Sequence, residues 1–418
     1  FGKLCTSLLV GLAAIPVLHC CFFRCGEVFS LFRFTYSPYE SLAVTLLLLL
    51  AFYLLLSSLI RFGHSAFVKF PVGSVILSLV LHRLKLDLDV NLLPEFASDK
   101  FTSLDAYSLQ GTVSIVTGAN SGVGLGVSHA LSSVGGTVVM ACRSTAACAK
   151  AAAEVNSKSA AYGGKAVPMA LDLSSFASVG SFAKEFLTRY ERLDKLLCNA
   201  GFATAPRNGQ RTTAEGFELG LGTMHFGHFV LFRLLQPVLL GANKQGNFDT
   251  RIVMTASVAS QVPIFANFHS SLLAGDGTGD LHGEITGVGS ISMYPRAKLA
   301  NVLFAREAQR RFPHITACSC HVGAVATSIW DSPFGIAQEL VDWYTQLVMR
   351  SLEQGRRPIL KCLLSQQQDV FQRGSYLDGM GHAVASEFGH RSSRNATLAR
   401  RLWDVSERVF REHHPDAP

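Results

Sequence analysis

Short β-branched runs alternate with longer helical stretches from about Ser108 onward, and this alternation limits the fold more than any other feature of the sequence. It is the pattern of βαβ units, in which helices connect parallel strands and cover both faces of one sheet. Because such crossovers are right-handed, six strands predict a doubly wound parallel α/β sheet with its ligand site at the carboxyl ends of the strands. The predicted strands are Thr112–Thr117, Thr137–Cys142, Ala166–Leu171, Lys195–Ala200, Arg251–Ala256 and Ile315–Cys320.

The chain carries less charge than a soluble domain of its size. It has 418 residues, of which 16% are charged, against roughly 25% in typical soluble domains. We therefore expect some apolar surface to face lipid. Residues 41–60 read SLAVTLLLLLAFYLLLSSLI, carry no charge and are bounded by Glu40 and Arg61, which matches the roughly 20 residues needed to cross a bilayer. Residues 39–61 are therefore predicted to form a transmembrane helix.

Three further segments complete the predicted domain organisation. Residues 1–38 are an apolar N-terminal segment, within which Leu4–Phe23 is a candidate first transmembrane helix. Residues 62–104, interrupted by charge and proline, are predicted to be an interfacial or linker segment. Residues 105–418 form the α/β domain. More basic residues closely follow the long span than precede it, which places that domain in the cytosol, and we expect an intracellular membrane such as the endoplasmic reticulum.

Two other classes of partner are not expected. The formal net charge is +7, but the basic residues are spread along the chain without a basic and aromatic patch, so no nucleic-acid binding is predicted. Cys318 and Cys320 precede His321, yet no second cluster has zinc-ligand spacing, so no metal is predicted. The cysteines of the large domain mostly lie in apolar runs, which predicts small buried core residues in a reducing compartment.

A glycine-rich segment, TGANSGVG at residues 117–124, directly follows the first predicted strand and precedes a helical pattern. Glycines here let the backbone turn tightly and approach a pyrophosphate, which then lies at the positive end of the helix. Glycines mark turns everywhere, but this position between strand and helix predicts a dinucleotide site in a Rossmann-type fold. The expected binding residues are Gly118, Asn120, Ser121, Gly122, Val123 and Gly124.

The end of the second predicted strand indicates which dinucleotide is bound. A carboxylate at this place would hold the ribose 2′-hydroxyl of NAD, whereas this sequence has Cys142 followed by Arg143. A guanidinium can bind the extra phosphate of NADP in a bidentate manner. The sequence therefore predicts NADP(H), with an exposed loop arginine as the alternative interpretation.

A tyrosine and a lysine four residues apart open a later helical stretch, in Tyr294-Pro295-Arg296-Ala297-Lys298. Side chains at these positions share one helix face. An ammonium beside a phenol favours the phenolate and is expected to lower the tyrosine pKa from about 10, which makes tyrosine a usable general acid or base. The pair follows both the glycine-rich segment and a strand that leads into Ser257.

In this order the motifs resemble those of the short-chain dehydrogenase/reductase family, and most closely its retinol dehydrogenase and WW-domain oxidoreductase branch. The resemblance covers about Ser108 to Phe410 and rests on TGANSGVG, ACR, LDLSS, CNAG, GFELGLGTMHFGHF, RIVMTASVAS, YPRAKLANVLF, HVGAVAT and ATLARRLWDVSERVF.

The resemblance implies a role for each matching residue. Ser257 would hydrogen-bond the substrate oxygen, Tyr294 would deliver or remove its proton, and Lys298 would hold the nicotinamide ribose. Ser257 could instead act only as a helix cap. These roles suit carbonyl reduction, which needs a hydride, a proton and a donor to the developing alkoxide. Further cofactor contacts are implied for Asp172, Leu173, Asn199, Ala200, Gly201, Gly323, Val325 and Thr327.

One departure from the family pattern puts turnover in doubt. Met224 stands where the family carries an asparagine that supports a water-mediated proton path to the lysine, and the neighbouring His225 points elsewhere in a regular helix. We therefore expect an active enzyme that is slowed at proton relay.

The leading prediction is a membrane-anchored NADP(H)-dependent oxidoreductase. It would interconvert a carbonyl and an alcohol on a lipophilic substrate such as a retinoid, steroid or lipid aldehyde. The alternative is a catalytically weak homologue that serves as a nucleotide-binding scaffold. A sugar-nucleotide epimerase fits poorly, because its glycine loop differs. A homodimer follows only by analogy with family members.

Overall fold

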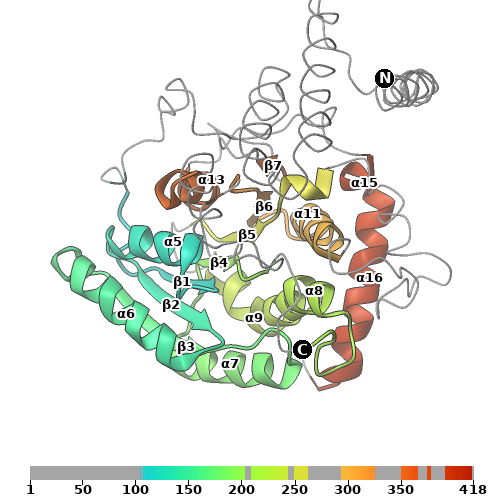
Figure 1. The fold of residues 1–418 in the computed structure, drawn as a ribbon, viewed down its shortest axis with the longest axis horizontal. Helices are drawn as coiled ribbons and strands as arrows, with labels where there is room; N and C mark the ends of the chain where they lie inside the picture. Colours follow the sequence, from blue (N-terminus) through green and yellow to red (C-terminus); the bar gives the residue numbers. More distant parts are fainter. Residues whose placement is uncertain are drawn as a thin grey trace, which may run out of the picture. The chain divides into compact units, whose positions relative to one another are not determined.

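The computed structural model describes residues 104, 107–202, 209–242, 249–261, 293–323, 325, 350–365, 374–377 and 391–416 (Figure 1). The chain divides into two units, Phe1–Val80 and Leu81–Pro418, and every described residue belongs to the second. The predicted transmembrane segments therefore lie outside the described residues. Within the described ranges, no helix combines the length and the apolar character that a bilayer crossing requires.

Seven parallel strands form one sheet in the order β3-β2-β1-β4-β5-β6-β7, which confirms the Rossmann-type prediction. The chain reverses direction across the sheet between β1 and β4, and ligand sites of such folds lie at this switch point. The six predicted strands are all present. The bounds are β1 Val113–Thr117, β2 Thr137–Cys142, β3 Lys165–Ala170, β4 Lys195–Cys198, β5 Arg251–Thr255, β6 Thr316–Cys320 and β7 Tyr376–Leu377.

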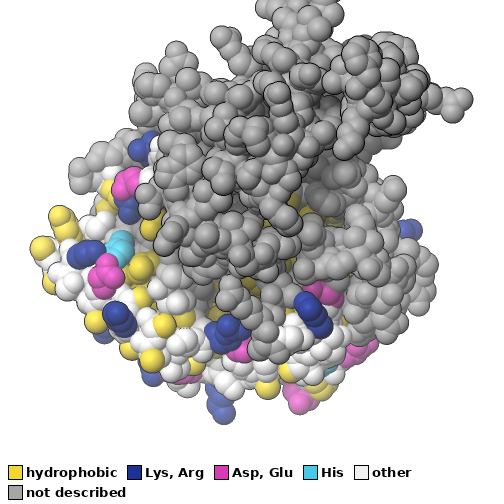
Figure 2. Space-filling view, viewed as in Figure 1, with side chains coloured by type: hydrophobic (Ala, Val, Ile, Leu, Met, Phe, Trp, Pro, Cys, Tyr) yellow, Lys and Arg dark blue, Asp and Glu magenta, His cyan; other side chains and the backbone are white. Residues whose placement is uncertain are grey.

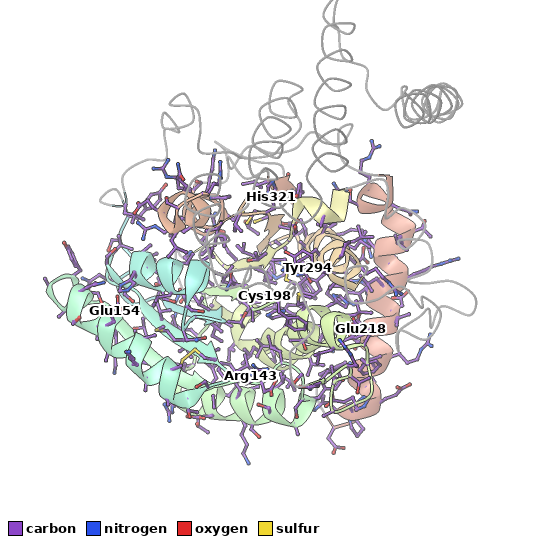
Figure 3. All side chains as sticks on the ribbon, viewed as in Figure 1. Arg143, Glu154, Cys198, Glu218, Tyr294 and His321 are labelled. Carbon is purple, nitrogen blue, oxygen red and sulfur yellow. A yellow bond between two sulfur atoms is a disulfide. The ribbon has the colours of Figure 1, made fainter. Side chains whose placement is uncertain are left out.

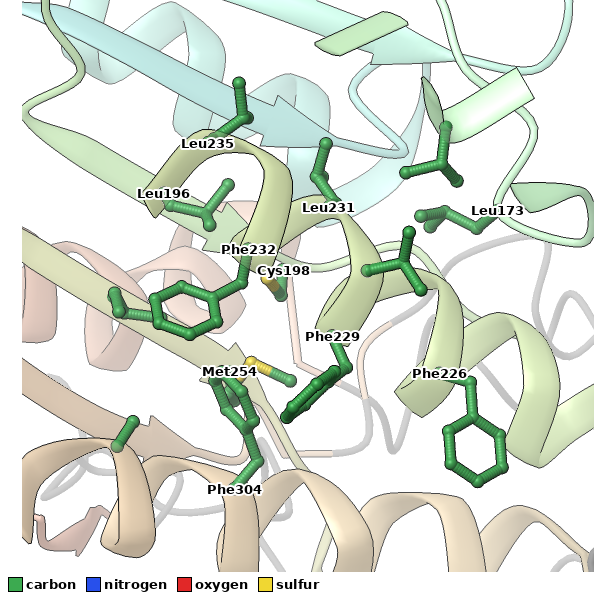
Figure 4. Close-up of a cluster of buried hydrophobic side chains, with 14 of the residues drawn as sticks. Leu173, Leu196, Cys198, Phe226, Phe229, Leu231, Phe232, Leu235, Met254 and Phe304 are labelled. Atoms are coloured by element: carbon green, nitrogen blue, oxygen red, sulfur yellow. The ribbon is translucent and has the colours of Figure 1, made fainter. Parts of the chain in front are cut away.

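Helices cover both faces of the sheet, so the central strands are buried on both sides and read as continuous apolar runs. Alternate residues of the strands β1 to β6 contribute to two separate cores. One core packs against α5 (Gly122–Ser132), α6 (Thr145–Ser159) and α13 (Leu352–Leu364). The other packs against α7 (Phe176–Arg189), α9 (Gly227–Ala242), α11 (Met293–Arg311) and α16 (Ala396–His413), and part of it is seen in Figure 4.

The last helix, α16, lies along α11. Trp403 is 4% exposed and its ring stacks on that of Phe304 in α11, with 5.5 Å between centroids. The Asn395 side chain caps the helix by accepting from the backbone N–H groups of Thr397 and Leu398. The short elements between these helices are η4 Ala160–Tyr162, α8 Leu219–Leu221, the π-helical turn η5 Gly222–Phe226, η6 Val258–Gln261 and α15 Arg391–Arg394.

A disulfide joins Cys142 at the end of β2 to Cys148 in α6. Both cysteines are buried, as the sequence predicts, but they are bonded to each other. This differs from the free thiols expected in a reducing compartment. The free cysteines of the described part, Cys198, Cys318, Cys320 and Cys362, are buried.

The described surface carries charges of both signs. In the view of Figure 2, basic and acidic side chains are interspersed, and apolar side chains stand among them. Several of the charged side chains form ion pairs along helices, as Lys158 and Glu154 do at 2.7 Å on α6. Exposed pairs of this kind contribute little to stability.

Candidate functional site

The glycine-rich segment turns tightly between β1 and α5. Gly118 has a φ of +66°, and a Cβ on it would lie 3.0 Å from Ala200 Cα. A Cβ on Gly124 would lie 2.4 Å from the Gly118 carbonyl oxygen and 2.7 Å from Asn199 Nδ2. Only glycine fits at these two positions, because side chains there would displace backbone. Ser121 is exposed and directly precedes α5. The N-terminus of that helix therefore lies within the glycine-rich segment.

Thr117, the first residue of this segment, ties it to the end of β4. Its hydroxyl oxygen accepts from the backbone N–H of Asn199 at 2.8 Å and of Ala200 at 3.0 Å. In return, Asn199 Nδ2 donates to the Thr117 carbonyl at 3.0 Å. The structure thus brings the two sequence motifs TGANSGVG and CNAG into direct contact at the switch point.

Tyr294 and Lys298 lie one helical turn apart at the start of α11. The Lys298 Nζ is 5.5 Å from the centroid of the Tyr294 ring, and the Tyr294 hydroxyl hydrogen-bonds to Ser257. Tyr294 is labelled at α11 in Figure 3. Ser257 Oγ also accepts from the backbone N–H of Ala259 at 3.2 Å. The two interpretations of Ser257, as site residue and as helix cap, are therefore compatible.

Burial controls the ionisation of this pair. It raises the pKa of Tyr294, and the hydrogen bond from Ser257 opposes that rise. Lys298 is 3% exposed, and burial lowers its pKa to about 8. Its Nζ donates to the Thr255 carbonyl at 2.9 Å. The prediction of a lowered Tyr294 pKa is therefore wrong for this structure, because desolvation of the phenol raises the pKa and outweighs the hydrogen bond from Ser257.

Met224 lies in the π-helical turn η5 and is 1% exposed. A Cβ on Gly201 would lie 3.0 Å from the Met224 sulfur and 3.3 Å from Lys298 Nζ, so thioether and ammonium border the same spot. The neighbouring His225 points away, as predicted, since its Nε2 lies 2.8 Å from Ser406 Oγ on α16. The sequence alone does not indicate the π turn, which makes this helix irregular.

The residues expected at the adenine side are spread over the ends of β2 and β3. Arg143 is exposed directly after β2 (Figure 3). Asp172 is half-buried, and its Oδ1 accepts from both the backbone N–H and the hydroxyl of Ser174. Leu173 is buried, and a Cβ on Gly227 would lie 2.3 Å from its carbonyl oxygen. Asp172 and Leu173 thus take part in a local turn and in the core.

The residues expected at the nicotinamide side follow β6. Gly323 has a φ of +78°, and its N–H donates to His321 Nδ1 at 2.9 Å. Val325 is buried and forms an isolated parallel bridge with Arg350. Thr327 lies outside the described residues.

Two polar residues in this region were missed from the sequence. Asn301 Nδ2 donates at 3.1 Å to the same Thr255 carbonyl that binds Lys298. His228 is buried with both ring nitrogens in contact with neighbours. Asn301 lies in the motif YPRAKLANVLF and His228 in GFELGLGTMHFGHF, but only their burial beside the other site residues distinguishes them.

Comparison with known proteins agrees with this geometry. The family model for short chain dehydrogenases matches residues 112–270. Human retinol dehydrogenase 11 is 31% identical over 301 residues, covering 71% of this chain and 85% of that protein. The WW domain-containing oxidoreductase of Danio rerio is 30% identical over 317 residues, covering 74% of this chain and 71% of that protein.

Among solved structures, an uncharacterised protein from Mycobacterium paratuberculosis superposes with a TM-score of 0.52 at 25% identity, covering 73% of this chain and 95% of that one. The predicted family and branch, and the prediction of an enzyme, are confirmed by the relatives. The chain belongs to the short-chain dehydrogenase family of oxidoreductases, on its retinol dehydrogenase-like branch.

Proposed function

We propose that the protein uses NADP(H) to interconvert a carbonyl and an alcohol on a lipophilic substrate. The observation that carries this proposal is the Tyr294 hydroxyl, which hydrogen-bonds to Ser257 with Lys298 one helical turn away. A proton donor, a second hydroxyl and a cation thus stand together beside the sheet. These are the groups that transfer of a proton to a reduced carbonyl oxygen requires.

The residues of the glycine-rich segment fit a dinucleotide. The glycines at 118 and 124 allow a close backbone approach next to the α5 N-terminus, where a pyrophosphate is stabilised. The exposed guanidinium of Arg143 suits the 2′-phosphate of NADP. Bound there, the nicotinamide supplies or accepts the hydride.

The chain's own groups handle the proton. The raised pKa keeps Tyr294 protonated at neutral pH, which is the form that donates a proton when a carbonyl is reduced. The Ser257 hydroxyl orients the substrate oxygen toward that phenol. Lys298 stabilises the phenolate that remains after proton transfer, since its ammonium lies 5.5 Å from the ring centroid.

A lipophilic substrate follows from the sequence outside the described residues. Residues 39–61 are predicted to anchor the protein in an intracellular membrane. An anchored domain has direct access to substrates dissolved in the bilayer. The name retinol dehydrogenase among the relatives supports the same substrate class.

The test is oxidation of NADPH by the full chain in detergent with a panel of carbonyls: a retinoid aldehyde, a steroid ketone and a lipid aldehyde. We expect turnover with at least one of them. Tyr294→Phe removes the proton donor and is expected to lower kcat by about 100-fold or more. Tyr162→Phe is the matched control, because Tyr162 is 57% exposed and lies far along the chain from the site, in η4. Equal rates in the two variants would contradict the proposed role of Tyr294.

Met224 favours a second candidate, a nucleotide-binding scaffold with weak catalysis. Its thioether occupies the space beside Lys298 and offers no hydrogen bond of the kind a water-mediated proton path needs. The same assay distinguishes the two functions. A scaffold binds NADPH in a fluorescence titration but oxidises it with none of the carbonyls.

A further inference from the structure

His228 is a buried histidine that the chemistry above does not use. It lies at the start of α9 and is 1% exposed. Its Nδ1 is 2.9 Å from the backbone oxygen of Met224, and its Nε2 is 2.9 Å from Thr117 Oγ1. One ring therefore contacts both the residue that opens the glycine-rich segment and the turn that packs beside Lys298.

The contacts determine the ring's protonation. A backbone carbonyl can only accept, so Nδ1 carries the hydrogen that is donated to Met224. In a neutral ring, Nε2 then has a lone pair and accepts from the Thr117 hydroxyl. Burial, together with the charge of Lys298, lowers the pKa of His228 to about 4, although the bond to Met224 opposes this. The ring is therefore neutral at physiological pH.

At the Thr117 end, the ring sets the direction of a hydroxyl group. Thr117 Oγ1 accepts two backbone N–H groups, from Asn199 and Ala200, and has one hydrogen to donate. His228 Nε2 at 2.9 Å is closer to this oxygen than the alternative acceptor, the Leu197 carbonyl at 3.3 Å. With the hydrogen directed at His228, both lone pairs remain for the two N–H groups that join β4 to the nucleotide loop.

At the other end, the ring holds the backbone of the π turn. The Met224 carbonyl that accepts from Nδ1 belongs to the same residue whose sulfur lies, like Lys298 Nζ, beside the Cα of Gly201. A shift of this backbone would change where the thioether lies relative to the ammonium. The position of the turn therefore affects the environment of Lys298, whereas the Thr117 contact affects the nucleotide loop.

We propose that His228 is a positioning residue that joins the two halves of the site, orienting the Thr117 hydroxyl under the nucleotide loop and anchoring the Met224 backbone beside Lys298. It acts through these two partners. The proposal rests on the proposed function, because the nucleotide loop and Lys298 are its two targets.

Two conservative substitutions separate the two contacts. Gln at position 228 can place an acceptor near Thr117 but cannot also donate to Met224, whereas Asn can donate to Met224 but cannot reach Thr117. We expect His228→Asn to raise the Kd for NADPH by about three- to tenfold, the effect of one uncharged hydrogen bond. We expect His228→Gln to retain the Kd within about twofold and to lower kcat by about three- to tenfold instead.

The matched control is His225, three residues earlier, which is equally buried but contacts Ser406 on α16 instead. His225→Asn and His225→Gln should change the melting temperature, while Kd and kcat stay within about twofold. Kd is measured by quenching of protein fluorescence and kcat by NADPH oxidation, both with the full chain. If the two His228 variants alter Kd and kcat in the same proportion, or if the His225 variants do so too, His228 has only a packing role. The Kd comparison requires no turnover, so it decides the role of His228 even where the proposed catalysis fails.

Discussion

Two buried lysines, Lys195 in β4 and Lys298 in α11, connect the charge of single residues to the stability of the fold. Burial lowers the pKa of each to about 8 from an ordinary value of 10.5. Below pH 8 both the folded and the unfolded chain hold these protons. Between pH 8 and 10.5 the unfolded chain holds more protons than the folded one, so the free energy of unfolding rises with pH in this range.

Lys298→Met is therefore expected to remove part of that rise, because methionine does not titrate. Urea unfolding of the wild type and the variant at several pH values between 8 and 10.5 measures the difference in slope. Lys195→Met provides the control: the same loss of slope is expected, but NADPH oxidation should be retained, since Lys195 begins the strand whose other end faces the site. Identical slopes in all three proteins would contradict the assigned pKa values.

Met224 offers a test of proton relay. Replacing the thioether with an amide adds hydrogen-bonding groups beside Lys298, in the space that Met224 shares with Gly201. We expect Met224→Asn to raise kcat several-fold, with KM for the carbonyl unchanged, because only proton delivery is affected. Steady-state kinetics with the best substrate of the panel measure this. An unchanged kcat would count against a slowed relay.

At the residue scale, the sequence was sufficient to identify Ser257, Tyr294 and Lys298 as neighbours, because motif order and helical spacing bring them together. It was not sufficient to predict the raised pKa of Tyr294, which depends on the packing that desolvates the phenol. His228 was missed for a related reason. Its ring contacts residues far apart in the sequence, and a lone histidine has no distinguishing pattern.

The connection between β2 and α6 is an element whose conformation is covalently restricted. The disulfide between Cys142 and Cys148 closes a short loop that contains Arg143, and the loop residues between them are exposed. A cross-link of this kind reduces the freedom of the open loop. The proposed contact of Arg143 with the 2′-phosphate of NADP should therefore depend on the bond.

Cys148→Ser is accordingly expected to raise the Kd for NADPH several-fold and the Kd for NADH much less, because NADH lacks the 2′-phosphate. Reduction of the wild type with dithiothreitol should have the same effect, with no further change in the variant. Cys362→Ser is the control, as Cys362 is a buried residue of α13 that takes no part in a disulfide. Titrations that show equal changes for both dinucleotides would contradict a role at the phosphate.

Helix α16 closes one side of a core next to α11, the helix that carries Tyr294 and Lys298. Trp403 contacts Phe304 on α11 and Phe229 on α9, with centroids 5.5 and 5.1 Å apart. Trp403→Ala should lower the free energy of unfolding by about 3–5 kcal/mol, as for other large core truncations. Urea denaturation measures the loss, and Arg401→Ala, at an exposed position of the same helix, should have little effect. A similar loss from both variants would mean that the aromatic packing is not what holds α16.

At the element scale, the six main strands and the long helices were predictable, since strong hydrophobic periodicity specifies them. Strand β7 was missed because two residues, Tyr376 and Leu377, carry no pattern and are extended only through pairing with β6. The π turn η5 was missed because it depends on backbone hydrogen bonding. The cystine pair was missed because strand and helix residues six positions apart meet only once the βα connection has folded.

For the whole molecule, the proposed membrane anchor is directly testable. The full chain is expected to require detergent for extraction and to float with phospholipid vesicles, because residues 39–61 carry no internal charge between Glu40 and Arg61. A chain that begins at residue 105, without the predicted spans and the interfacial segment, should remain largely in the aqueous fraction. Equal flotation of both chains would show that the attachment resides elsewhere.

The position of α16 in the chain has a consequence for biosynthesis. It is translated after every other described element, yet it covers α11 and completes one of the two cores. Until it has emerged from the ribosome, the apolar faces of α9 and α11 remain open, although the half of the domain that carries the glycine-rich segment is already made. A nascent chain should therefore acquire a dinucleotide-competent half first and a proton-donating half last, and it would depend on chaperones during that interval.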